Sequence, residues 1–244
     1  MEKDTSIDIK TLSMDVARIR RSFETEKLIL SQVAYLITKD LIRNLKLSPG
    51  QMILERTLVE VLDMSRTPVR EALVRLEMEG WGEIVPRHGF VVVDIKAEDV
   101  QQVFEMVETL DELAISLAVK HVTESDLMEL ERIIGRQREA VNEENALAWN
   151  NLDHLFHEKL IEMANHTRLS KVRAIEYDHL YRVNLYTMNM RQVSKESLIE
   201  HEAILGVMKA REAEAARIML KSHRARAFGE VIETLKIMEV EKER

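Results

Sequence analysis

The amino-acid sequence predicts a mainly α-helical protein in two parts. The first is a small helical unit that carries a β-hairpin, and the second is an all-α antiparallel helical bundle. The 244 residues include only 7 glycines and 3 prolines, the residues that most often interrupt helices. No proline occurs from Glu98 onward, and apolar residues recur there at helical spacing. This length is sufficient for two domains with separate cores.

The elements of the first part follow one another closely. Residues 1–24 are expected to form a polar N-terminal extension with a faint helical stripe, and an amphipathic helix follows over 28–44. Ser48-Pro49-Gly50 ends that helix. Residues 55–62 are predicted as a further helix, and Asp63-Met64 as a short turn that leads into the next helix.

The segment 65–73 (SRTPVREAL) carries the strongest functional signal. Ser65 stands at the expected helix N-cap, and Pro68 falls in the first turn, where backbone N–H groups have no intrahelical partner. Side chains that can contact phosphates and bases crowd the same helix start: Arg66, Thr67 and Arg70. Apolar residues follow at i, i+4 and i+7: Val69, Leu73 and Leu76. A helix with one buried face and arginines at its exposed start is typical of DNA recognition.

Two short apolar runs after this helix predict a β-hairpin. Gly80 ends the helix, because glycine tolerates the left-handed conformation beyond a helix C-terminus. The β-branched runs 83–85 and 90–93 are separated by a basic turn at 86–89. Together these elements predict a winged helix-turn-helix over 25–94. Alternatively, the arginines of the helix are ordinary solvated charges, but the complete motif and wing favour DNA binding.

The second part is expected to span residues 98–244, after a short linker at 94–97. Six helices are predicted by the apolar periodicity, near 98–121, 124–142, 146–165, 168–190, 196–209 and 212–240. Short polar turns separate them, and short connections between long helices place consecutive helices antiparallel. We therefore expect a helical bundle.

Composition and charge limit the compartment and the partners. The chain has no cysteine, which excludes disulfide scaffolds and thiolate metal sites and is typical of a reducing cytoplasm. No charge-free apolar run approaches the about 20 residues that span a bilayer, and the N-terminus lacks an apolar signal core. We therefore expect a cytoplasmic protein with no membrane partner.

The formal net charge of −8 is unusual for a protein that binds DNA. Residues 1–94 hold 14 Lys+Arg and 15 Asp+Glu, and residues 95–244 hold 21 and 28. A DNA contact must then depend on a local group of basic side chains, because salt screens charges beyond about 8–10 Å. We expect five to converge on one face: Arg56, Arg66, Arg70, Arg87 and His88. The acidic remainder predicts weak non-specific DNA binding.

Four residues of the bundle make a candidate metal site. Asp153 and His157 are four residues apart and share one helix face, while His201 and His223 lie close to the apolar faces of two later helices. Three inward imidazoles and one carboxylate suit Zn, Ni, Fe or Mn. The alternative is a set of hydrogen-bonded core or surface histidines, and spacing alone favours it, because eight histidines produce such pairs by chance.

The N-terminal motifs resemble those of GntR-type bacterial regulators. The similar pieces are Ser48-Pro49-Gly50, Glu55-Arg56, the 65–73 segment, Leu76-Glu77-x-Glu79-Gly80 and Pro86-x-x-Gly89. The resemblance implies operator contacts from Arg56, Ser65, Arg66, Thr67, Arg70, His88 and Gly89. Asp63 stands where these turns usually carry glycine, and aspartate also tolerates the required backbone.

The C-terminal 150 residues resemble the FCD effector domain of the FadR-like GntR subgroup. The matching pieces are Asp153-x-x-Phe156-His157, Ala164-Asn165, Glu200-His201-x-x-Ile204 and Ala215-Ala216 leading to His223. The resemblance implies that the bundle serves as an effector, metal-binding and dimerisation domain. It also implies a divalent metal on Asp153, His157, His201 and His223, with a small carboxylate as effector. Many relatives carry an effector-binding arginine where this chain has Val107, so Arg182 and Arg191 become the candidates for that role.

These expectations combine into a DNA-binding transcription regulator that is not an enzyme. The resemblance implies a repressor, and two subunits paired as a homodimer would bind a palindromic double-stranded operator. Two alternatives stay open: a metal-dependent enzyme attached to a DNA-binding unit, and a regulator whose metal is purely structural. The sequence offers the enzyme no separate general base, nucleophile elbow or glycine-rich phosphate loop.

Overall fold

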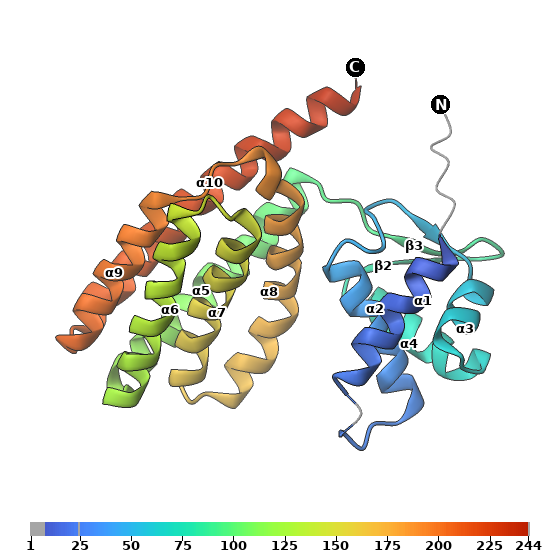
Figure 1. Ribbon diagram of the computed structural model, residues 1–244, viewed down its shortest axis with the longest axis horizontal. Coiled ribbons are helices and arrows are strands. Elements are labelled where there is room, and N and C mark those ends of the chain that lie inside the picture. Colours follow the sequence, from blue (N-terminus) through green and yellow to red (C-terminus); the bar gives the residue numbers. More distant parts are fainter. Residues whose placement is uncertain (1–7, 24, 244) are drawn as a thin grey trace. The chain divides into compact units, whose positions relative to one another are not determined.

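A computed structural model describes residues 8–23 and 25–243, and Figure 1 shows them as ribbons. The chain divides into two compact units, residues 1–95 and residues 96–244. Both are mainly helical, and the first also contains a small antiparallel sheet. The predicted fold class is therefore confirmed. None of the helices in the described residues is long and apolar enough to cross a bilayer.

The first unit is built from four helices around an apolar core. They are α1 (Ile9–Arg21), α2 (Leu30–Arg43), α3 (Glu55–Leu62) and α4 (Arg66–Met78). Helix α1 lies within the segment that the sequence presented as a polar extension. Its faint apolar stripe, Leu12, Val16 and Ile19, is buried in the same core as α2, α3 and α4. The guanidinium of Arg20 donates to the carbonyl of Leu62 at the end of α3.

The sheet of this unit has three antiparallel strands in the order β1-β3-β2. They are β1 (Met52–Ile53), β2 (Gly82–Val85) and β3 (Gly89–Val92). Strands β2 and β3 form the predicted hairpin, in which Gly82 is opposite Val92 and Val85 is opposite Gly89. Strand β1 was not predicted, because two residues are too few to show the alternation of a strand.

Left-handed backbone shapes both the turn of the helix-turn-helix and its wing. Asp63 has a φ of 48° directly after α3, so aspartate does adopt the conformation expected of this turn. Gly89 has a φ of 112° at the start of β3. A Cβ atom at this position would collide with the carbonyl oxygen of Ile53, so only glycine is accommodated there.

The second unit is a bundle of long helices, as predicted. They are α5 (Ala97–His121), α6 (Glu124–Asn142), α7 (Ala146–Met163), α8 (Thr167–Thr187), α9 (Lys195–Lys209) and α10 (Ala213–Glu243). A short 3₁₀ helix, η1 (Met188–Met190), follows α8, so the helix expected to run to residue 190 ends slightly earlier. Thr123 and Asp126 form a capping box that starts α6. Helix α10 packs along α5 and α9, and α7 packs against α5, α6 and α8.

Candidate functional site

A hollow lies between α4 and the wing of the first unit. All five basic residues that were expected to converge line it: Arg56, Arg66, Arg70, Arg87 and His88. Gly89 belongs to the same lining. Ser65 and Thr67 are exposed at the start of α4. Residues that are up to 33 positions apart in sequence thus form one basic concave surface, although the unit as a whole is slightly acidic.

Ser65 occupies the N-cap position of α4, but its side chain makes no capping hydrogen bond. The sequence that follows removes one of the two usual donors. A capping hydroxyl accepts from the N–H of the second or third helical residue, and the third residue here is Pro68, which has no N–H. The exposed hydroxyl is therefore available to an external partner.

Arg70 is not free in the structure, because its Nε lies 2.8 Å from the Oε2 of Glu55. The hydrogen bond to Glu55 and the charge of its carboxylate raise the pKa of Arg70, so this guanidinium is charged at any physiological pH. The arginine side chain is 65% exposed and the glutamate side chain 26%. A pair with this exposure contributes little to stability, so a DNA phosphate can replace the carboxylate at low cost.

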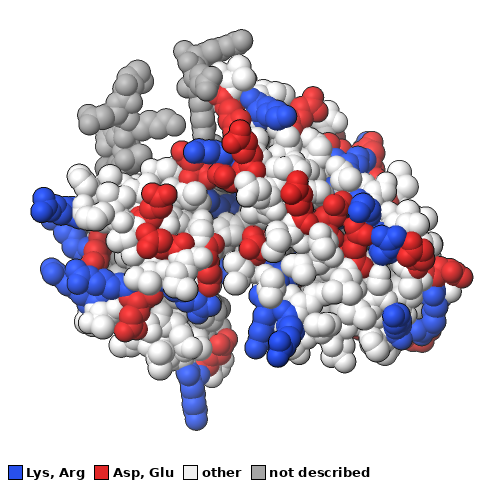
Figure 2. Space-filling model, turned by 180° about the vertical axis from the view of Figure 1, so that it is seen from behind, with Lys and Arg blue, Asp and Glu red and all other residues white. Residues whose placement is uncertain are grey.

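Figure 2 shows one face of the molecule, on which basic and acidic side chains are interspersed over both units. This distribution agrees with the nearly balanced counts in residues 1–94. A positive potential large enough to hold DNA without regard to sequence is therefore not expected on this face.

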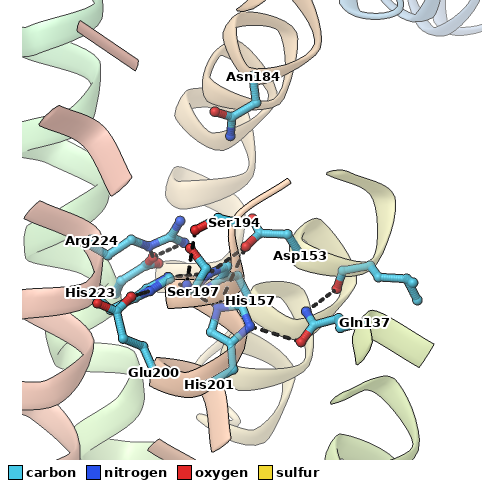
Figure 3. Close-up of polar contacts among 12 residues, drawn as sticks. Gln137, Asp153, His157, Asn184, Ser194, Ser197, Glu200, His201, His223 and Arg224 are labelled. Carbon is cyan, nitrogen blue, oxygen red and sulfur yellow. Dashed lines mark hydrogen bonds and ion pairs between the residues drawn. The ribbon is translucent and has the colours of Figure 1, made fainter. Parts of the chain in front are cut away.

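The second unit brings together the four residues of the candidate metal site. Asp153 and His157 come from α7, His201 from α9 and His223 from α10 (Figure 3). Their possible ligand atoms all lie within 4.8 Å of one another. The Nε2 atom of His223 is 3.2 Å from the Nε2 atoms of both His157 and His201. The three imidazoles are at most 2% exposed.

The hydrogen bonds on the far side of two rings determine which nitrogen carries the proton. Gln137 donates its amide to the carbonyl of Leu152, so its oxygen faces Nδ1 of His201 at 3.0 Å and accepts from it. Glu200 accepts from Nδ1 of His223 at 2.8 Å. When both rings are neutral, protons on the two Nδ1 atoms leave lone pairs on the two Nε2 atoms that face each other at 3.2 Å. Such an arrangement is unfavourable without a cation between them and is typical of metal-binding histidines.

Burial also favours the neutral form of two of the rings. It lowers the pKa of His157 and of His201 well below the usual histidine value, with further contributions from nearby positive charges. Neutral imidazole is the form that binds a metal. Burial raises the pKa of Asp153, because a lone carboxylate is poorly solvated there. A divalent cation would compensate that carboxylate.

Glu200 and Gln137 were missed by the sequence interpretation. Burial opposes ionisation of Glu200, but hydrogen bonds from His223 and Arg226 outweigh it and lower the pKa to about 2. Glu200 is therefore an anion that orients His223. Its position beside His201 in sequence was a possible signal, whereas Gln137 lies 64 residues away from the ring it contacts and gave none.

A buried ionic cluster, also not predicted, lies next to this centre. Asp111 on α5 accepts from Nε of Arg173 on α8 and from Nε of Arg224 on α10, each at 2.9 Å. Although burial disfavours the carboxylate, the two guanidinium groups hold the pKa of Asp111 below its usual value. The Arg173 guanidinium also stacks 3.4 Å from the ring centre of Tyr177. Three helices are thus joined by one desolvated carboxylate.

A cavity of about 80 Å³ adjoins the four-residue centre within the second unit. Asp153 and His223 line it together with Arg191, Arg224 and several apolar side chains. Of the two arginines suggested for effector binding, Arg191 is therefore at the cavity. Arg182 is buried on α8 and does not belong to the lining. Val107, at the position of the family's arginine, is completely buried in α5.

Comparison with known proteins explains the two-unit architecture. Residues 30–92 match the gntR family of bacterial regulatory proteins, and residues 102–226 match the FCD domain. The chain belongs to the GntR family and carries an FCD domain. The first match covers α2 to β3 and leaves α1 outside, whereas the second covers all four residues of the candidate metal site.

Related proteins in this family are named as transcriptional regulators. The chain is 29% identical over 190 residues to the HTH-type regulator YdhC of Bacillus subtilis, covering 76% of this chain and 83% of YdhC. It is 27% identical to the Nta operon transcriptional regulator of Aminobacter aminovorans, over 77% of this chain and 88% of that protein. This GntR protein is accordingly a transcription regulator of the helix-turn-helix type, in which the winged unit binds DNA.

Solved structures agree on the fold. The structure of E. coli McbR superimposes with a TM-score of 0.73 at 22% identity, covering 84% of this chain and 98% of McbR. The structure of a GntR regulator from Rhodococcus superimposes with a TM-score of 0.67 at 19% identity, covering 83% of this chain and 97% of the Rhodococcus chain. At these identities the agreement concerns the arrangement of helices and strands.

Proposed function

We propose that this protein is a repressor whose operator affinity is controlled by an organic acid bound at or near a divalent metal in the FCD domain. The observation that carries the proposal is the close approach of the Nε2 atoms of His201 and His223, which face each other at 3.2 Å while Gln137 and Glu200 contact their Nδ1 atoms. This geometry supports a bound cation, and the cavity beside it supports a small ligand.

The winged unit contacts the operator through the hollow between α4 and the wing. Arg66 and Arg70 at the start of α4 bind guanine edges or phosphates, and a good bidentate arginine–guanine pair contributes about 1–3 kcal/mol of discrimination. The remaining contacts position the unit on the backbone of the duplex: Arg56, Ser65, Thr67, His88 and Gly89. A homodimer presents two such units to the two halves of a palindromic operator.

The metal is held by Asp153, His157, His201 and His223. Zn, Ni, Fe and Mn all accept this donor set. When bound, the ion supplies positive charge and open coordination positions for an oxygen of the effector. Glu200 and Gln137 keep the rings of His223 and His201 in the required orientation through their Nδ1 atoms. Effector binding then changes operator affinity by a coupling of about 1–3 kcal/mol.

The proposal is tested by titrating a fluorescent operator duplex with the full-length protein and recording anisotropy. The duplex is selected from random sequence with the purified protein. Titrations compare the protein as purified, after chelation, and after reloading with each candidate metal, while elemental analysis gives the metal content. Native mass spectrometry of the purified protein identifies any acid that remains bound, which is then added back.

We expect one metal ion per chain, loss of the effector response after chelation, and recovery of the response on reloading. A metal that changes only the melting temperature, with the same DNA response in both forms, would mean a purely structural role. If the purified protein selects no duplex from random sequence, the assignment of the protein as a DNA-binding regulator is contradicted. Turnover of the retained acid would favour the alternative of a metal-dependent enzyme fused to a DNA-binding unit.

A further inference from the structure

Helix α1 lies outside the family match but belongs to the fold of the winged unit. The match begins at residue 30, whereas α1 ends at Arg21. The apolar stripe of α1 is buried in the core of the unit, and the helix packs against α2 and α3 (Figure 1). Because one face is buried in this way, the other residues of α1 are held at fixed positions on the surface of the unit. The polar face of α1 therefore adds to the surface that the matched residues form.

Helix α1 is basic, unlike the rest of the winged unit. Its 13 residues include four Lys+Arg and a single acidic residue, Asp15, whereas residues 30–92 hold eight Lys+Arg and eight Asp+Glu. Three of the basic residues stand in the last turn: Arg18, Arg20 and Arg21. Cations at a helix C-terminus interact favourably with the helix dipole, which alone would explain their presence. The position of this turn on the unit gives them a second use.

The last turn of α1 is held beside the turn of the helix-turn-helix. The guanidinium of Arg20 donates through Nη2 to the carbonyl of Leu62, the last residue of α3. Ser65, the N-cap of α4, follows Leu62 by three residues, and three residues span at most about 11 Å. In helix-turn-helix proteins the first helix crosses the DNA backbone while the start of the second helix enters the major groove. A cation beside the end of α3 is therefore close to the phosphates that flank the groove.

Two arginines of this turn have no carboxylate partner among the described residues. Arg20 donates to the neutral carbonyl of Leu62, and its Nε is buried without a partner. Arg21 is exposed, and its Nε donates to a carbonyl of its own helix at 3.3 Å. Arg18, in contrast, pairs with Asp15 at 3.1 Å. The last turn of α1 thus carries two uncompensated positive charges on a chain whose net charge is −8.

We propose that the last turn of α1 binds phosphates of the operator through Arg20 and Arg21. DNA is the partner because its backbone has the opposite charge and because this turn continues the surface of the helix-turn-helix. Phosphate contacts position a protein on the duplex without reading its sequence. This inference rests on the operator binding of the proposed function, and it adds a contact that strengthens binding to any duplex.

The test measures the salt dependence of DNA binding by the full-length protein. Anisotropy titrations use the selected operator and a scrambled duplex between about 50 and 200 mM salt. The main variant is Arg20→Gln/Arg21→Gln. Arg20→Lys/Arg21→Lys keeps both charges, and Arg21→Gln alone keeps the contact of Arg20 with Leu62. Lys10→Gln/Arg18→Gln is the matched control, because it removes the same charge from exposed positions of the same helix. Thermal melting and analytical ultracentrifugation report folding and oligomeric state.

We expect Arg20→Gln/Arg21→Gln to weaken binding of both duplexes about tenfold or more at about 100 mM salt, with the ratio of the two affinities unchanged. Each lost phosphate contact lowers the slope of log affinity against log salt by about 0.9, so the slope should fall by about 1.8 in this variant and by about 0.9 in Arg21→Gln. The lysine variant should stay within about threefold of wild type, because an ammonium also binds phosphate. The control should keep the wild-type slope.

Four results would overturn the inference: the glutamine variants keep the wild-type slope, the control loses as much slope, only the operator is bound more weakly, or the loss of binding follows a change in oligomeric state. The last result would assign this turn to a contact between two copies of the chain. The metal and effector responses are measured in separate titrations, so their absence would contradict the proposed function and leave the role of α1 standing. The scrambled duplex tests α1 even if no operator is selected. If the wild-type protein binds neither duplex at about 50 mM salt, the inference and the proposed function are both contradicted.

Discussion

The two units of this protein place their functional side chains in opposite environments. In the winged unit, the basic residues of the hollow project from the surface of a core that is almost entirely apolar. In the FCD domain, the candidate metal-binding groups are inside. The buried residues there include His157, His201 and His223 as well as the ionic cluster around Asp111.

This difference determines how function and stability are related in each unit. An exposed arginine at the start of α4 can be replaced without leaving any buried group unpaired. A buried charge or imidazole in the bundle cannot be replaced in this way, because its partner on another helix would be left unpaired. Substitutions in the winged unit should therefore separate DNA binding from folding, whereas substitutions in the bundle centre should affect both.

The largest expected effect is that of Asp111→Ala. This change removes the carboxylate that Arg173 and Arg224 share, and although Arg173 keeps its contact with Glu158, breaking a buried pair in this way costs about 3–5 kcal/mol. We expect the free energy of unfolding of the bundle to fall by that amount. The measurement is urea denaturation of a Trp81→Phe background, in which Trp149 is the remaining tryptophan and reports on the FCD domain.

Glu129→Ala is the matched control for Asp111→Ala. Glu129 pairs with Arg132 on the surface of α6, and such exposed pairs contribute less than about 1 kcal/mol. Equal destabilisation by the two substitutions would show that the buried Asp111 cluster contributes no more to the free energy of unfolding than an exposed ion pair does. The free energy of unfolding of the winged unit, followed through Trp81 in a Trp149→Phe background, should be the same with and without either substitution.

Acid should reduce the contribution of Asp111. Its pKa in the folded protein lies below the unfolded value of about 3.9, so the carboxylate stabilises the folded state above that pH. The stabilisation is lost as the pH falls through the folded pKa. The difference in unfolding free energy between wild type and Asp111→Asn should be constant near neutral pH and should shrink below about pH 4. A difference that persists unchanged at pH 3 would contradict this assignment.

Arg66→Ala tests the other side of the comparison. Loss of a bidentate base contact should weaken operator binding by about 1–3 kcal/mol, or roughly 5- to 150-fold. The melting temperature should stay the same, because Arg66 is exposed. Anisotropy titrations with the operator and with a scrambled duplex measure specificity, and differential scanning calorimetry measures stability. If the ratio of affinities for the operator and the scrambled duplex stays unchanged, Arg66 does not take part in sequence recognition.

Glu200→Ala should weaken metal binding by about 10- to 100-fold, the usual result of removing a carboxylate that orients a ligating histidine. Glu200 accepts from Nδ1 of His223 at 2.8 Å. Glu202→Ala is the control, because Glu202 lies on the same helix but pairs with Arg138 at the surface. Competition against a chromophoric chelator gives the Zn²⁺ affinity of each variant. Equal affinities in the two variants would mean that Glu200 does not orient His223.

The same contrast explains what the sequence could predict. In the winged unit, α2 to α4 and the hairpin are specified locally, by Pro68, Asp63, Gly80 and the short apolar runs, so their positions were clear from neighbouring residues, whereas the two-residue strand β1 was not. The helices of the bundle were equally clear from periodicity. The approach of His157, His201 and His223 was expected chiefly from the family resemblance, because their spacing of up to 66 residues carries little information. Gln137 and the Asp111 cluster depend wholly on long-range packing, and no local pattern marks them.

The smallest expected effect concerns Glu55, an acidic residue in the lining of the basic hollow. Glu55 holds Arg70 at 2.8 Å and places a negative charge where phosphates approach. Glu55→Gln should change stability by less than about 1 kcal/mol, since the pair is exposed. It should raise DNA affinity about two- to fivefold, more at low salt than at high salt, because a repulsive charge is removed and Arg70 is released. Operator titrations between 50 and 200 mM salt would measure this gain. A loss of affinity would instead mean that Glu55 positions Arg70 for recognition, which would make the exposed surface as dependent on paired charges as the interior of the bundle.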